Sequence, residues 1–165
     1  KTKRQNVMWQ TRAVIDGLTQ TVPDSIFAVI AAKDLRDRIC GCGHINVAEW
    51  KKNTDILPHH AKSFQRVAWF WRFIEEMDDE QRSKFLFWVS GYRFLPPGGF
   101  SALQASDGQH LRFRIFLEDE GGGYNGRLPV AHTCSLQCDL PCFPSFECMR
   151  DKLCTAMRHV DFGAI

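Results

Sequence analysis

Apolar side chains recur every three or four residues along several stretches of the chain, a spacing that predicts amphipathic helices. The strongest example is Phe64–Ile74. Asp78–Gln81 can cap the next helix, which stops at Gly91. Ser145 caps a final helix whose apolar positions continue to Ala156. The later part of the chain is therefore expected to contain three substantial helices.

The earlier part of the chain predicts further helices and then a break. An apolar stripe near the start predicts one helix, and Asn46 with Glu49 has the form of a capping box that opens a short one. Asn53–His60 is polar and has no apolar period, so it is the best candidate for a hinge. We therefore expect a helical part over residues 1–53 and a second domain over 54–165.

A period of two replaces the helical period in two places. Apolar side chains alternate with polar ones over Leu111–Leu117 and again over Leu136–Leu140, the pattern of half-buried strands. Cys134 lies at the entry of the second of these strands. Helices combined with a short sheet predict an α+β fold, a small mixed domain with helices packed on the sheet.

Composition narrows the class of protein. The chain has 165 residues, 44% of them hydrophobic, with five Trp and 13 Phe, enough to build a core without a metal or a disulfide. A net charge of +2 argues against nucleic acid and anionic membranes as partners. No apolar run approaches the roughly 20 residues that span a bilayer. The start, Lys1–Arg4, has neither an initiator Met nor a signal-peptide core, so we expect a fragment of an intracellular protein, cytoplasmic or nuclear.

The seven cysteines are more easily explained as reduced thiols than as a disulfide framework, because no secretion signal is seen. Some of the gaps between them have the length found in zinc sites. However, Cys138 falls on an apolar strand face, and Cys148 and Cys154 lie on a predicted helix. We therefore expect no metal and no other cofactor.

The segment Leu128–Cys134 combines the features of a reactive thiol. Pro129 prevents pairing as a regular central strand, which leaves Cys134 near a strand end. His132 precedes it by two residues, so both side chains share a side in an extended chain. A free thiol, with a pKa of about 8.5, is little ionised at pH 7, and a nearby imidazolium could raise that fraction. From spacing alone, an ordinary buried cysteine is the commoner explanation.

The same segment, Leu-Pro-Val-Ala-His-Thr-Cys, resembles the active-site loop of HECT-type ubiquitin ligases, commonly Leu-Pro-Thr-Ser-His-Thr-Cys. Two positions depart from the family: Ser135 and Leu136 stand where Phe and Asn are usual. Four other stretches also resemble it, namely the end of the N-terminal lobe between Asp34 and Thr54, a Phe-Trp pair at Phe70-Trp71, a Pro-x-Gly-Gly-Phe stretch at Pro96–Phe100, and a Leu-Pro pair at Leu140-Pro141.

The resemblance implies an E3 ligase fragment made of the catalytic C-terminal lobe and the last helices of the N-terminal lobe. Cys134 would accept ubiquitin from an E2 conjugating enzyme as a thioester and pass it to a substrate lysine, with His132 and Thr133 supporting the loop. Phe162 stands fourth from the end, where family members place a phenylalanine needed for transfer. Ubiquitin, the E2 and a substrate protein would be the partners, the E2 binding mainly through the absent part of the N-terminal lobe.

Two other functions remain open at this point. A non-catalytic ubiquitin-binding or protein-interaction module would carry the same surface with an inert thiol. A zinc-stabilised interaction domain would require stoichiometric metal.

Overall fold

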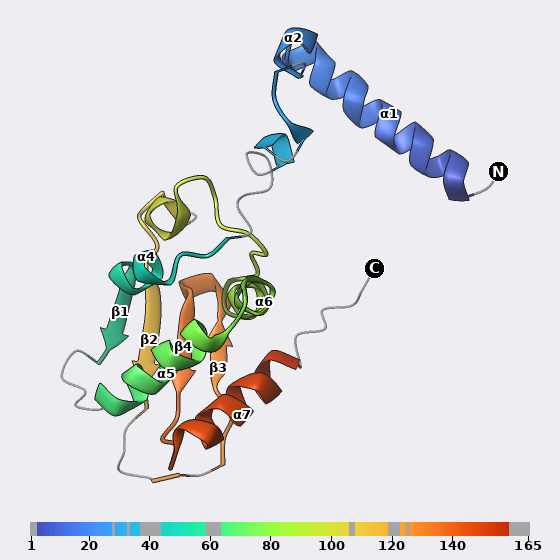
Figure 1. Ribbon diagram of the computed structural model, residues 1–165. Helices are drawn as coiled ribbons and strands as arrows, with labels where there is room; N and C mark the ends of the chain where they lie inside the picture. Colours follow the sequence, from blue (N-terminus) through green and yellow to red (C-terminus); the bar gives the residue numbers. More distant parts are fainter. Residues whose placement is uncertain are drawn as a thin grey trace. The chain divides into compact units, whose positions relative to one another are not determined.

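The computed structural model describes residues 3–27, 29–32, 34–36, 44–58, 64–105, 108–118, 123–124 and 126–158. The chain divides into two compact units, Lys1–Ile39 and Cys40–Ile165. In the smaller unit, helix α1 spans Lys3–Thr21 and helix α2 spans Asp24–Phe27 (Figure 1). The helix predicted near the start of the chain is thus confirmed. In the part of the chain that the structure describes, no helix is long and apolar enough to cross a membrane.

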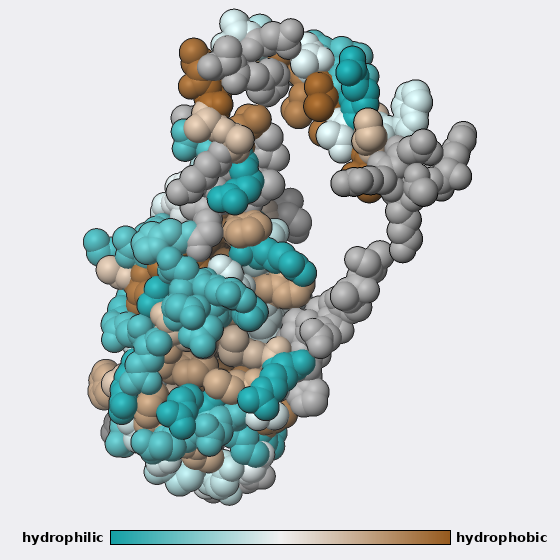
Figure 2. Space-filling model, turned by 45° about the vertical axis from the view of Figure 1, so that its right-hand side comes forward, coloured by the Kyte–Doolittle hydropathy of each residue, from teal (hydrophilic) through white to brown (hydrophobic). Residues whose placement is uncertain are grey.

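The smaller unit keeps apolar side chains at its surface, which appear brown in Figure 2. The large apolar residues that are exposed in this unit are Val7, Met8, Trp9, Val14, Ile15, Ile26 and Val29. The buried hydrophobic residues that the structure describes all lie in the larger unit, from Ile45 onward. The predicted apolar stripe is therefore present on α1, but the described residues build no core around it.

The larger unit contains a four-stranded mixed sheet. Its strands are β1 (Thr54–Leu57), β2 (Phe113–Leu117), β3 (Val130–His132) and β4 (Gln137–Leu140). They lie in the order β1-β2-β4-β3; β2 is parallel to β1 and β4, and β3 is antiparallel to β4 (Figure 1). β3 is therefore an edge strand, joined to β4 by a short connection.

Helices and short 3-10 turns complete this unit. They are α4 (Val47–Lys52), α5 (Phe64–Glu76), α6 (Asp79–Ser90), η1 (Gly99–Ala102), η3 (Thr133–Ser135) and α7 (Phe146–Arg158). The three longer helices and both predicted strands lie where the sequence patterns indicated. Helices combined with a small mixed sheet confirm the α+β prediction.

The segment expected to be a hinge is different in the structure. Thr54–Leu57 forms β1, in which Thr54 pairs with Phe113 of β2. The sequence analysis predicted no strand over Asn53–His60, and the structure has one over four of these residues. His59 and His60 lie outside the described residues, and the hinge itself stays a prediction. The partner strand is remote in sequence, so local periodicity could not reveal the pairing.

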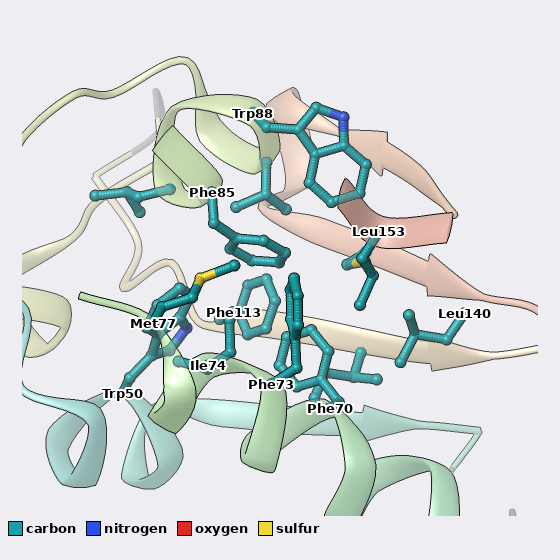
Figure 3. Packing of buried hydrophobic residues seen from close by; sticks show 14 of the residues in the cluster. Trp50, Phe70, Phe73, Ile74, Met77, Phe85, Trp88, Phe113, Leu140 and Leu153 are labelled. Atoms are coloured by element: carbon teal, nitrogen blue, oxygen red, sulfur yellow. The ribbon is translucent and has the colours of Figure 1, made fainter. Parts of the chain in front are cut away.

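The division between the two units also falls earlier than 53/54. α4 lies in the larger unit because its Trp50 is fully buried there, as Ile45 nearly is. Trp50 stacks on Phe100, with ring centroids 4.7 Å apart, and meets Phe113 edge-on at 5.4 Å. Phe70 and Phe85 join the same aromatic cluster (Figure 3). Residues before Thr54 thus supply the centre of the core, while the assignment of the two parts to HECT lobes stays a prediction.

The predicted start of α4 is half confirmed. The Asn46 side chain caps the helix by accepting hydrogen bonds from the backbone N–H of Ala48 and Glu49 at 2.9 and 3.1 Å. Glu49 does not close the box; its carboxylate accepts instead from Ser101 N at 3.2 Å and occupies the space that a side chain on Gly99 would need. Since Gly99 has φ +68°, a side chain there would be strained and would also collide with Glu49.

The other predicted caps are present. Asp78 and Gln81 form a reciprocal capping box at the start of α6, and Gly91 ends this helix in the left-handed region with φ 77°. At the start of α7, Ser145 Oγ accepts from Cys148 N at 3.2 Å. These local signals could be predicted from sequence because each involves residues only a few positions apart.

Candidate active site

Cys134 is the middle residue of η3, the single turn that connects β3 to β4. Its side chain is exposed, in agreement with the predicted position beside a strand end. β4, the strand that follows this turn, is anchored in the core, because Cys138 and Leu140 are fully buried. Arg66, also buried, donates to the Leu140 carbonyl at 3.1 Å. The thiol is therefore presented to solvent by a rigid support.

The residue that ends the turn is conformationally unusual. Leu136 has φ 50° and ψ 49°, the left-handed region, which costs an L-residue roughly 1–2 kcal/mol. Its side chain is nevertheless buried, with 1% exposure, and burying a leucine contributes about 1.5–3 kcal/mol. The Leu136 carbonyl also accepts from Arg114 N at 2.9 Å. Burial of the Leu136 side chain in the core therefore compensates for the cost of its left-handed backbone. At this position the HECT family usually has Asn, a residue that tolerates the left-handed conformation.

His132 makes its side-chain contact across the strand pair. Its Nε2 lies 2.8 Å from Oδ2 of Asp139, while Oδ1 of Asp139 accepts from Gln137 Nε2 at 2.7 Å. The Ser135 hydroxyl donates to the His132 carbonyl at 3.3 Å. A polar cluster, His132 with Gln137 and Asp139, therefore lies on the outward face of the hairpin that carries Cys134.

The structure brings three of the four predicted site residues together. His132 is the last residue of β3, and Thr133 and Cys134 follow in η3. Thr133 is exposed, and the structure gives its side chain no hydrogen bond within the described residues. Phe162 lies outside the described residues.

Gln137 and Asp139 were missed by the sequence analysis. A signal for them existed, because they alternate with Cys138 and Leu140 and must share the outward face of the strand. The pairing of His132 opposite Gln137, and diagonally with Asp139, requires the register of β3 on β4. That register is not contained in the motif.

The remaining described cysteines are in different surroundings. Burial, aided by the neighbouring Asp139 carboxylate, strongly raises the pKa of the Cys138 thiol, which therefore stays protonated at neutral pH. A hydrogen bond with Cys148 raises the pKa of Tyr124. Cys142, Cys148 and Cys154 are partly exposed. Among the cysteines that the structure describes, Cys134 is thus the exposed one, and no group of three metal-ligating side chains gathers in that part of the chain.

Comparisons of this chain with a family model and with individual known proteins agree on one family. A family model described as HECT-domain (ubiquitin-transferase) matches residues 2–164. The E3 ubiquitin-protein ligase RSP5 of Saccharomyces cerevisiae is 34% identical over 158 residues, 95% of this chain and 19% of that protein. The E3 ubiquitin-protein ligase ptr1 of Schizosaccharomyces pombe is 32% identical over 97% of the chain. The E3 ubiquitin-protein ligase HUWE1 of Mus musculus is 33% identical over 93%.

The chain spans about a fifth of RSP5, 5% of ptr1 and 3% of HUWE1. The matches nevertheless cover almost all of the chain, and with them the turn that carries Cys134. This chain belongs to the HECT-domain family.

Proposed function

We propose that this chain is the catalytic C-terminal part of a HECT-type E3 ubiquitin ligase in which Cys134 carries ubiquitin as a thioester. The observation that supports this most directly is the exposed thiol of Cys134 on a turn held by two buried strand residues, Cys138 and Leu140. The family of the chain gives the reaction class, and the exposed turn gives the nucleophile a reachable position.

The transfer has two steps. The Cys134 thiol gives up its proton as its sulfur attacks the carbonyl carbon of the thioester that joins the ubiquitin C-terminus to an E2 cysteine; a new S–C bond forms, and the E2 sulfur leaves with its electron pair and ends as a thiol. A neutral lysine amine of the substrate then attacks the Cys134 thioester. The amide bond forms, the amine loses a proton, and the Cys134 sulfur is released. Covalent catalysis thus divides one transfer into two.

A thioester assay tests the nucleophile. The full-length protein is mixed with ubiquitin-loaded E2, and adducts are separated with and without dithiothreitol. The wild type should give an adduct that dithiothreitol cleaves, Cys134→Ala should give none, and Cys134→Ser should give any adduct as a thiol-resistant oxyester. Cys148→Ala, which alters a partly exposed cysteine on α7, is the matched control and should keep the adduct.

An adduct that survives in Cys134→Ala would disprove the assignment of the nucleophile. Ubiquitin binding without any adduct in the wild type would instead favour the non-catalytic interaction module.

The smaller unit would be the end of the N-terminal lobe. Exposed apolar side chains on α1, such as Trp9 at 77% exposure, are the kind of surface that packs against further protein. We propose that the rest of that lobe covers α1 and provides most of the E2 contact. The partners of the whole ligase would then be ubiquitin, an E2 and a substrate protein.

Phe162 is proposed to act in the second step only, as the resemblance of its position implies. Phe162→Ala should therefore form the Cys134 adduct at a normal rate and discharge it to lysine slowly. Pulse–chase measurement separates the two steps, and thermal denaturation checks the fold. Equal loss of both steps together with a lower melting temperature would mean that Phe162 is structural.

A further inference from the structure

Folding stability alone does not explain the contact between His132 and Asp139. The pair is partly exposed, with 44% and 18% of the two side chains accessible, and such an exposed contact contributes little to folding even when the histidine is charged. Yet Asp139 is tightly placed, since β4 is buried on both sides of it at Cys138 and Leu140. Both carboxylate oxygens are used, one by His132 and the other by Gln137. A rigid acceptor thus faces one particular nitrogen of the imidazole.

That arrangement determines which nitrogen of the ring carries hydrogen. A carboxylate only accepts hydrogen bonds, so Nε2 of His132 must donate to Asp139. In neutral imidazole the other nitrogen, Nδ1, is then unprotonated and can accept a proton. Within the residues that the structure describes, Nδ1 has no hydrogen-bond partner. Asp139 thus fixes the orientation of the ring through Nε2, and Nδ1 can accept a proton. His132 lies two residues before Cys134 in the sequence.

We infer that Asp139 is a positioning residue that holds His132 as the Nε2–H tautomer and so makes Nδ1 the proton acceptor for the Cys134 thiol. The part played by Nδ1 in catalysis rests on the proposed function. As Sγ attacks the thioester carbonyl, its proton passes to Nδ1 and the bond from the carbonyl carbon to the E2 sulfur breaks. The E2 sulfur leaves with the electron pair and takes the proton from the imidazolium, which regenerates neutral His132.

The first test is spectroscopic and does not depend on ubiquitin transfer. Long-range proton–nitrogen NMR spectra of the chain at a pH where the imidazole is neutral report which ring nitrogen of His132 carries hydrogen. The wild type should show the Nε2–H tautomer, and Asp139→Asn should lose that preference. Asp55→Asn is the matched control, because Asp55 accepts from Arg112 across the opposite end of the sheet at 2.8 Å. It should leave the His132 signals unchanged.

The second test measures thioester formation on Cys134 in the full-length protein with excess ubiquitin-loaded E2. Asp139→Asn should slow this step about tenfold or more, as loss of a carboxylate that sets the tautomer of a histidine base does. His132→Ala should slow it at least as much, and adding Asp139→Asn to it should change nothing further, because Asp139 acts through His132. Asp55→Asn should keep the wild-type rate.

The outcomes separate this inference from the proposed function. An unchanged tautomer in Asp139→Asn, or an undiminished rate of adduct formation on Cys134, would overturn the role of Asp139 and leave the ligase assignment standing. Additive losses in the double variant would also overturn it, since Asp139 would then act by a route other than His132. Absence of any Cys134 adduct in the wild type would remove the catalytic part, while the NMR result would still decide the tautomer.

Discussion

The inward and outward faces of β4 hold their side chains by different forces. Inward, Cys138 and Leu140 are fully buried among apolar neighbours. Outward, Gln137 and Asp139 are joined to His132 by hydrogen bonds. The four residues of β4 therefore contribute two side chains to the core and two to the polar cluster beside the candidate site. The comparison indicates that substitutions on the inward face should change stability, and substitutions on the outward face should change chemistry.

The largest loss of stability should follow a truncation at the centre of the core. Trp50→Ala removes a fully buried ring that stacks on Phe100 at 4.7 Å, so unfolding should become easier by about 3–5 kcal/mol. Urea denaturation measures the change. Trp9→Ala, which truncates a Trp with 77% exposure, should shift stability by only about 0.5 kcal/mol. Similar losses in the two variants would contradict the burial described for Trp50.

Replacing each of two cysteines by serine gives the most direct test of the difference between stability and chemistry. Cys138→Ser places a hydroxyl in a fully buried site and should cost about 1–3 kcal/mol of stability while adduct formation on Cys134 persists. Cys134→Ser should leave stability within about 0.5 kcal/mol and abolish the thioester. Thermal denaturation and the adduct assay on both variants decide the matter. If Cys138→Ser also removed the adduct without loss of stability, the inward face would have a chemical role.

A smaller effect should follow from the contact between Glu49 and Gly99, where backbone shape and a hydrogen bond coincide. Gly99→Ala should cost roughly 1 kcal/mol for its positive φ and about 1 kcal/mol more for displacing Glu49 from Ser101. Gly91→Ala is the control, because φ is similarly positive but no atom lies within 4 Å of the added carbon. In a Glu49→Ala background the two glycine substitutions should cost the same, which chemical denaturation can check.

The parts of the fold that could be predicted are those whose signal is local. Asp78 with Gln81 and Ser145 with Cys148 are close in sequence, and the caps of α6 and α7 follow from them. β1 could not be predicted, since its four residues acquire a strand's hydrogen bonds only from β2. For the same reason Glu49 was assigned to its own helix, although the structure pairs it with Ser101.

The candidate site divides in the same way. A contiguous motif was enough to single out Cys134 and its neighbours in the turn as candidates. Asp139 could not be identified in this way, because its contact with His132 depends on how β3 is aligned with β4. The left-handed backbone at Leu136 was likewise hidden, since nothing in a leucine favours it apart from the core that receives its side chain.

The parallel pairing of β1 with β2 has a consequence for how the chain acquires its shape. Thr54 must find Phe113, whereas His132 finds Gln137 within the same hairpin. Distant pairings form slowly because a long loop must close before any contact rewards it. During synthesis, which proceeds from the N-terminus, β1 would leave the ribosome well before its partner and remain unpaired. When the full-length chain refolds, the local hairpin that presents Cys134 can therefore assemble early, whereas β1, the strand at the opposite edge of the sheet, pairs later.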